Sequence, residues 1–129
     1  MVEEWLSAVD ARDGARLLAL TTPVVEVVGP RGRARAGRAV LADWLGRAGF
    51  SAVSRRWFCG GDGRVVVEQD ARWVDLATGA QQGRARIASE FLVDPSERLV
   101  TRYVRHDAGT AAALAAAGLS EDDEVTGRQ

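Results

Sequence analysis

The first half of the chain carries its apolar residues at helical spacing. This spacing predicts one helix over residues 2–11, a short second helix that Asp13 caps, and a third helix between Gly37 and Gly49. The apolar faces of these helices comprise Val2, Trp5, Leu6, Val9, Leu17, Leu18, Leu20, Val40, Leu41, Trp44 and Leu45. A short strand over residues 24–28 separates the second helix from the third, and a polar connection follows it.

The second half of the chain changes to a period of two, which is typical of strands that bury one face. The alternating segments span residues 51–59, 64–76, 83–94 and 98–107, and short turns join them. Strands joined in this way predict an antiparallel meander. Helices segregated from antiparallel strands indicate an α+β fold.

The last residues differ in composition from the rest. Thr110 caps a predicted helix over residues 111–117, and we expect the acidic tail over 120–129 to be mobile. We therefore divide the chain into a main domain, residues 1–107, and a C-terminal helix and tail, residues 108–129.

Composition narrows the function classes. The chain has 129 residues and a formal net charge of −1, so we do not expect nucleic-acid binding. No apolar run is long enough for a membrane span. The single cysteine, Cys59, has no partner for an internal disulfide, and the single histidine, His106, cannot build a usual zinc site. We expect a bacterial cytoplasmic protein that uses no metal or cofactor.

Four stretches, taken in order, resemble the nuclear transport factor 2-like superfamily, and in particular its SnoaL-like and ketosteroid isomerase-like branches. They are EEWLSAVDARDGARLLAL (residues 3–20), VVGPRGRARAGRAVLADWL (27–45), RVVVEQDARWVDLATG (64–79) and ASEFLVDPSERLVTRYVRHD (88–107). The resemblance implies a cone, in which a strongly curved antiparallel sheet wraps around three helices and opens at one end. It also implies a homodimer joined through the sheet.

The resemblance does not extend to the steroid isomerase mechanism. Ketosteroid isomerases use a tyrosine, an aspartate base and a second, protonated aspartate. Matching the stretches without gaps places Trp5, Gly29 and Ser89 at these three positions. Trp5 has no phenol, Gly29 has no side chain, and Ser89 is a weaker, neutral hydrogen-bond donor.

The same matching implies which side chains face the inside of the cone and contact a ligand there. They are Trp5, Trp44, Trp57, Ile87, Ser89 and Phe91. An apolar cavity with a few polar groups is the usual site for a small molecule. Large aromatic residues in a small domain also serve as core, so both interpretations stay open.

The strand over residues 64–76 has two contrasting faces. The resemblance turns Glu68, Asp70 and Arg72 toward the cavity, whereas apolarity turns the opposite face, centred on Val67, toward the core. A dimer that buries the apolar face reconciles the two; alternatively, the charged face is solvated. A register slip of one residue exchanges the faces.

On the last strand, the resemblance places Arg102 and His106 inside the cone. Histidine titrates near neutral pH, and with Asp70 or Glu68 beside it we expect His106 to act as a general acid or base. Asp107 matches an acidic residue that SnoaL-like cyclases carry near the end of this strand. Arg102 or Ser89 is the expected donor to a developing oxyanion.

Two classes of function follow. The first is a domain that binds a small, largely apolar molecule. In its sharper form it is a cofactor-independent cyclase, dehydratase or isomerase in which His106 and a carboxylate, Asp70 or Asp107, move a proton. The second is a non-catalytic binding or dimerisation module with a filled core. Either an anionic ligand or solvent is expected to meet the local cluster of Arg31, Arg33, Arg35 and Arg38.

Overall fold

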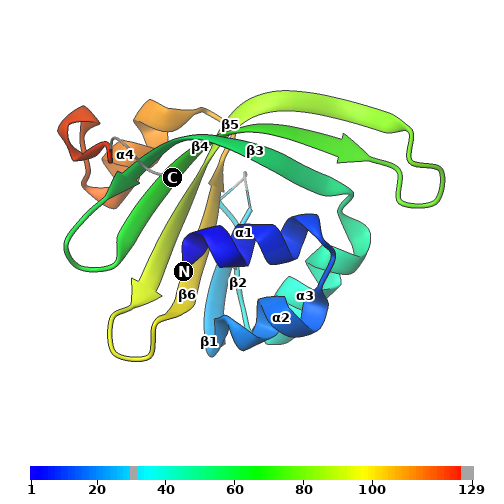
Figure 1. Ribbon diagram of the computed structural model, residues 1–129, viewed down its shortest axis with the longest axis horizontal. Coiled ribbons are helices and arrows are strands. Elements are labelled where there is room, and N and C mark those ends of the chain that lie inside the picture. Colours follow the sequence, from blue (N-terminus) through cyan, green and yellow to red (C-terminus); the bar gives the residue numbers. More distant parts are fainter. Residues whose placement is uncertain (30–31, 126–129) are drawn as a thin grey trace.

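The computed structural model describes residues 1–29 and 32–125 (Figure 1). Its helices and strands follow the predicted order, with one short strand added inside the expected polar connection. The elements are α1 (Val2–Asp10), α2 (Gly14–Ala19), β1 (Thr21–Val28), β2 (Ala34–Ala36), α3 (Arg38–Arg47), β3 (Phe50–Cys59), β4 (Arg64–Val74), β5 (Gln81–Asp94), β6 (Leu99–His106), α4 (Thr110–Ala117) and the 3₁₀ turn η1 (Glu121–Asp123).

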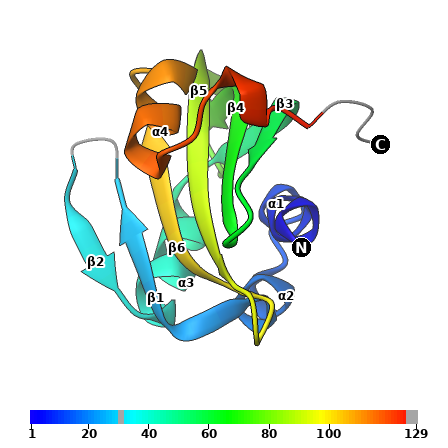
Figure 2. The same cartoon turned by 90° about the vertical axis from the view of Figure 1, so that its left-hand side faces the viewer.

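The strands of the described residues form one curved sheet in the order β2-β1-β6-β5-β4-β3. Neighbouring strands are antiparallel except β1 and β6, which run parallel with Glu26 opposite Arg102 and Val28 opposite Val104. Figure 2 shows β1 between β2 and β6. The sheet is therefore mixed rather than wholly antiparallel. The last strand of the meander, β6, lies beside β1 and runs in the same direction.

Helices α1, α2 and α3 lie on the concave side of the sheet (Figure 1). Their apolar faces and the inner faces of the strands form the main core, as the helical spacing predicts. Members of this core include Trp5, Val9, Leu17, Leu41, Leu45, Phe50, Val67, Ile87, Phe91 and Tyr103. The arrangement is the expected cone, an α+β fold in which a curved sheet wraps around three helices from the N-terminal half.

Two sequence signals place the ends of the helices. The Asp13 carboxylate accepts a hydrogen bond from the backbone N–H of Arg16 at 3.1 Å and so caps α2. Gly49 follows α3 where the chain crosses the end of β4. A Cβ atom at Gly49 would lie 1.7 Å from the carbonyl oxygen of Val74, so this close approach requires glycine.

Helix α4 packs on the outer face of the sheet, away from the other helices (Figure 1). It covers only part of that face. Together with three strands it forms a second, smaller core of Phe58, Val66, Ala88, Ala113, Leu114, Ala117 and Leu119. Helix α4 therefore packs on the same sheet as the rest of the fold. The sequence spacing of its alanines did not predict which strands it contacts.

The acidic turn after α4 is bound to β3. Arg56 forms ion pairs with Glu121 and with Glu124, the second at 2.8 Å. The backbone N–H of Val125 donates to the carbonyl oxygen of Trp57 at 2.8 Å. Residues 120–125, expected to belong to a mobile tail, are thus held against the sheet, and the rest of that tail lies outside the described residues.

Candidate functional site

Strand β4 turns its apolar face to the helices. Val67 and Ala71 are buried in the main core, and Gln69 lies fully buried between them. The alternation of the strand puts Glu68 and Asp70 on the outer face. The charged face therefore does not line the interior, contrary to the placement that the resemblance implies, because burying several charges against the helices carries a large desolvation cost.

An aromatic cluster lies inside the cone. The ring of Trp5 in α1 meets Phe91 edge to face at 5.1 Å between centroids, and meets Tyr103 at 5.0 Å. Trp44 in α3 lies 5.9 Å from Tyr103 and 5.7 Å from Phe50. The predicted ligand residues Trp5, Trp44 and Phe91 therefore pack mainly against other aromatic side chains.

Three polar side chains lie within this apolar interior. The Ser89 hydroxyl donates to Oε1 of Gln69 at 2.6 Å and also interacts with the Tyr103 phenol. A phenol is protonated at neutral pH, and burial raises the pKa of Tyr103 further, so its O–H remains able to donate. Within the described residues, Nε2 of Gln69 is buried without a hydrogen-bond partner. Because an unpaired buried donor costs about 1–3 kcal/mol, this N–H is ready for an acceptor atom that enters the interior.

Arg105 closes one side of the interior. Its guanidinium lies 4.6 Å from the centre of the Trp73 ring and donates to both carboxylate oxygens of Asp107, at 2.7 and 3.0 Å. The cation–π contact of Arg105 with Trp73 joins this ion pair to the edge of the main core, against which Trp73 packs. The predicted catalytic residue Asp107 is thus linked to the core through Arg105.

A groove of about 290 Å³ opens beside α3, and we call it the α3 groove. It is lined by Val27, Gly29, Arg33, Arg35, Val40, Trp44 and Arg47. Trp44 is shared, because its ring lines the groove and also contacts Tyr103 in the aromatic cluster. The groove therefore combines apolar walls with an arginine rim, and it adjoins the interior of the cone.

The expected arginine cluster divides between two roles. Arg33 and Arg35 line the α3 groove. Arg38 instead donates two hydrogen bonds to the carbonyl oxygen of Thr21, at 3.1 and 2.6 Å, and so joins α3 to β1. Arg31 lies outside the described residues.

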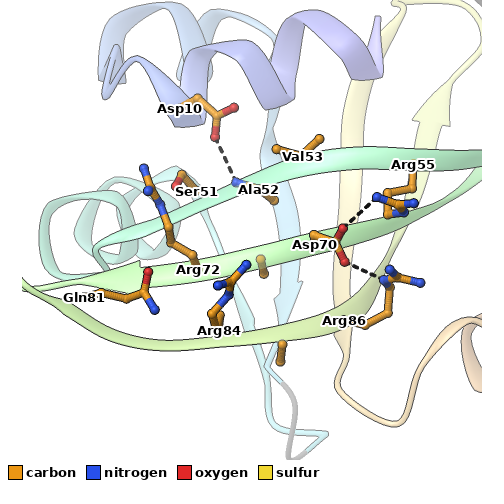
Figure 3. A pocket seen from close by; sticks show the side chains of 12 residues that line it. Asp10, Ser51, Ala52, Val53, Arg55, Asp70, Arg72, Gln81, Arg84 and Arg86 are labelled. Atoms are coloured by element: carbon orange, nitrogen blue, oxygen red, sulfur yellow. Dashed lines mark hydrogen bonds and ion pairs between the residues drawn. The ribbon is translucent and has the colours of Figure 1, made fainter.

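His106 and Asp70 lie on the outer face, on strands that β5 separates. Nε2 of His106 lies 2.8 Å from Oε1 of Glu90. Asp70 accepts hydrogen bonds from Arg86 and, at 3.0 Å, from Arg55 (Figure 3). The hydrogen bond from Arg86 is the largest cause of the lowered pKa of Asp70. The expected acid–base pair of His106 and Asp70 is therefore not formed, because each residue has another partner.

Two residues expected to bind ligand lie on the same outer face. Glu68 accepts a hydrogen bond from the Thr110 hydroxyl at 2.6 Å, and Arg102 lies 2.7 Å from Glu26 in an ion pair. On β6 it is Tyr103, not Arg102, that faces the helices. The resemblance therefore placed Arg102 and His106 on the wrong side of β6, as it placed Glu68 and Asp70 on the wrong side of β4.

Two further residues expected to bind ligand lie on the inner side. Ile87 is buried in the main core, and Trp57 packs against that core from β3 while remaining partly exposed. The register of β3 against β4 shifts between Ser54 and Arg56, as at a β-bulge. Because of this irregularity Val53 is 67% exposed, although it lies an even number of residues before Trp57 on the same strand.

Neither a metal site nor a membrane segment is found in the described part of the chain. No three His, Cys, Asp or Glu side chains gather there as the ligands of an ion would. None of the helices there combines the length and apolarity needed to cross a membrane.

No protein-family model and no curated protein matches the chain. Solved structures do match it. A protein of unknown function from Burkholderia pseudomallei, described as NTF2-like, shares 16% sequence identity at a TM-score of 0.66, over 90% of this chain and 93% of the other. The chain has the nuclear transport factor 2-like (NTF2-like) fold. The resemblance drawn from the four sequence stretches is thus confirmed at the level of the fold.

Two other solved structures with this fold have more specific descriptions. SalBIII, an epoxide hydrolase/cyclase-like enzyme of pyran ring formation in the polyether salinomycin, has a TM-score of 0.72 and 16% identity, over 95% of this chain and 90% of its own. TerC, co-crystallised with polyporic acid, has a TM-score of 0.68 and 20% identity, over 90% and 93%. At these identities the likeness concerns the fold, and the chemistry rests on this chain's own residues.

Sequence reasoning missed the residues that form the polar part of the interior. Gln69 stands in an otherwise apolar alternation from Val65 to Trp73, and this was the available signal for a buried polar group. Tyr103 and Arg105 gave no such signal, because both faces of β6 mix apolar and charged residues. Only the packing of β6 against the helices distinguishes them.

Proposed function

We propose that this NTF2-like chain binds a small, ring-containing organic molecule that carries a carboxylate or a similarly acidic oxygen, in the α3 groove. The observation that carries the proposal is the pairing of an apolar wall with guanidinium groups that are still available. Trp44, Val27 and Val40 supply the wall. Arg33 and Arg35 are exposed and form no ion pair with any residue that the structure describes.

The groove suits this ligand class in size and in chemistry. Its volume of about 290 Å³ is near the lower end of small-molecule sites, which span roughly 300–1,000 Å³. A planar guanidinium binds a carboxylate through two parallel hydrogen bonds. Arg47 is less available, because it already pairs with Asp43 at 3.0 Å. The descriptions of SalBIII and TerC support a cyclic, acidic organic molecule as the class to test first.

Titration with 1-naphthoate, followed by tryptophan fluorescence, tests this proposal. We expect saturable quenching that Trp44→Phe reduces, because Trp44 is the tryptophan that lines the groove. Arg35→Gln should weaken binding about tenfold, the effect of losing one charge-assisted contact of ~1.4 kcal/mol. Arg16→Gln, an exposed arginine on α2, is the matched control and should leave binding unchanged.

Two results contradict the proposal. Equal affinity in the wild type and in Arg35→Gln shows that the arginine rim does not bind the carboxylate. An absence of saturable quenching favours the second class of function, a non-catalytic module whose cone is filled by its own side chains.

The polar interior favours a second candidate function, a cofactor-independent enzyme of the cyclase, dehydratase or isomerase type. Behind Trp44, the Tyr103 phenol and the free N–H of Gln69 are donors in a dry environment, where they stabilise a developing oxyanion most effectively. Asp107 is the carboxylate at this side of the cone and takes the proton in this scheme. His106 and Asp70 have no part in it, because both lie on the outer face.

Deuterium exchange of the α protons of 2-tetralone, followed by NMR, tests the second candidate. The reaction breaks a C–H bond, and the enolate oxygen that forms accepts hydrogen bonds from the interior donors. Tyr103→Phe should slow the protein-dependent exchange about 10²-fold, the typical effect of removing one oxyanion donor. His106→Gln should leave the rate unchanged. Exchange no faster than in buffer, or equally fast in Tyr103→Phe, excludes this chemistry for the probe.

A further inference from the structure

The outer face of the sheet is only partly covered. Helix α4 packs on one part, over Val66 and Ala88. Another part, formed by β3, β4 and β5, carries a groove of about 970 Å³ (Figure 3). We call it the outer groove; it is separate from the α3 groove, which lies between β1, β2 and α3.

Two arginines in the outer groove stand directly opposite each other. Arg72 on β4 is the cross-strand partner of Arg84 on β5. Both side chains are exposed, and Figure 3 shows both on the groove side of their strands. Like charges placed directly opposite each other destabilise a sheet. Neither guanidinium has an ion pair or a hydrogen bond with a residue that the structure describes.

The neighbouring row of the same strands shows how such a charge is usually balanced. In the next pair on the same face, Asp70 stands opposite Arg86 and forms ion pairs with both Arg86 and Arg55. Among the residues that the structure describes, no carboxylate does this for Arg72 and Arg84. Asp10, the other acidic residue in the groove, attracts Arg72 at a distance but bonds to the backbone N–H of Ala52 at 3.3 Å, and its pKa is raised by burial.

We propose that the outer groove binds the phosphate monoester of a small organic molecule, with the phosphate between Arg72 and Arg84. A dianion matches two unpaired guanidinium groups, and each group donates in a fork that fits phosphate oxygens. Val53, 67% exposed in the same groove, gives the organic part an apolar contact. A second copy of the chain is a poorer occupant, because it brings the same excess of arginine to the contact.

Binding of 1-naphthyl phosphate, followed by line broadening in ³¹P NMR, tests this inference. We expect saturable binding that falls at least about tenfold in Arg84→Gln, the loss of one charge-assisted contact. Arg16→Gln, which removes an exposed charge on α2, should bind normally. Arg84→Gln should also fold normally, since it relieves a like-charge pair, and its thermal transition checks this.

Further ligands identify what is recognised. 1-Naphthol should bind far more weakly than its phosphate if the arginine pair holds the dianion. Inorganic phosphate should bind in an Arg84-dependent way but more weakly, and equal affinity would overturn the role of the organic part.

Two results overturn the site itself. If Arg35→Gln, not Arg84→Gln, abolishes binding, the phosphate occupies the α3 groove and the outer groove is not the site. If the chain dimerises through this face, Arg84→Gln changes the mass measured by sedimentation and 1-naphthyl phosphate does not bind. Because the two grooves share no residue, failure here leaves the proposal for the α3 groove untouched.

Discussion

On the inner face of β4, Val67 and Ala71 are buried under helices, whereas on the outer face of the same strand Asp70 and Arg72 meet other charged side chains. The inner face is stabilised by removing apolar area from water, about 25 cal/mol for each Å². The outer face is held by ion pairs that remain in contact with water and contribute about 0–1 kcal/mol each. Successive residues of β4 are thus stabilised in different ways, one by apolar packing and the next by ion pairs.

This difference explains why the two halves of the molecule offer different chemistry. A dry, aromatic interior strengthens a few fixed donors such as Tyr103, but it does not accommodate free charge. The outer face tolerates many charges, and an unpaired one there marks a place where a ligand can add the missing partner. Two of the residues that the sequence predicted as catalytic acids or bases, His106 and Asp70, lie on this outer face.

The largest effect expected from the comparison is on stability. Phe91→Ala removes a ring that is 1% exposed in the aromatic cluster and should lower the free energy of unfolding by about 3–5 kcal/mol. Val53→Ala, on the outer face and 67% exposed, should change it by less than about 0.5 kcal/mol. Urea denaturation measures both. Comparable losses in the two variants would show that the outer face carries a hidden core contact.

A smaller effect concerns the buried polar pair. Ser89→Ala leaves Oε1 of Gln69 without its 2.6 Å donor and should cost about 1–3 kcal/mol. The double variant with Gln69→Leu removes both partners, together with the unpaired Nε2, and should recover most of this loss. A double-mutant cycle in urea checks the coupling. Simple additivity of the two substitutions would mean that the pair does not interact as described.

The pH dependence of stability separates Asp10 from Asp70. Burial raises the pKa of Asp10 above 3.8, so its ionisation in the folded state opposes folding as the pH rises through that raised pKa. The Arg86 hydrogen bond lowers the pKa of Asp70 below 3.8, so its contribution is complete above 3.8 and is lost as the pH falls through the lowered pKa.

Substitution by asparagine turns this contrast into a measurement. Asp10→Asn should raise the free energy of unfolding near neutral pH, and Asp70→Asn should lower it. When the pH is below the pKa of the residue in both the folded and the unfolded state, the free energy of unfolding of each variant should approach that of the wild type. Urea titrations across this pH range test the signs, and effects of equal sign would contradict the assigned environments.

The smallest expected effect is local. Arg56→Gln removes the ion pairs that hold the acidic turn against β3, so the amide of Val125 should exchange with solvent faster. Arg47→Gln breaks a different ion pair, with Asp43 on α3, and serves as the matched control. Hydrogen exchange followed by mass spectrometry compares the two. Unchanged exchange in Arg56→Gln would show that the backbone bond alone holds the turn.

Local patterns predicted the helices, the Asp13 cap and the strands of the meander, because each depends on residues close in sequence. The choice of inner face on β4 followed from the apolar alternation around Val67, and the resemblance misdirected it. Three features had no local signal. They are the parallel pairing of β1 with β6, the bulge beside Arg56, and the contact of Arg56 with Glu124, which lies 68 positions away.

The same long-range principle limited the prediction of the site. Trp44 was expected inside the cone, and it does border the aromatic cluster, but its second role in the α3 groove depends on β1 lying beside α3. The pairing of Arg72 with Arg84 follows from the β4–β5 register. Neither arrangement is visible without the fold, because each needs two segments to meet.

The place of β1 beside β6 has a consequence for synthesis on the ribosome. Glu26 and Arg102, which pair across these strands, are 76 positions apart, and at about 5–20 residues per second the second emerges roughly 4–15 s after the first. During that interval β3, β4 and β5 emerge, but β1 still lacks its parallel neighbour β6. The six-stranded sheet is therefore joined across its middle only near the end of translation, although β1 is the first strand to be made.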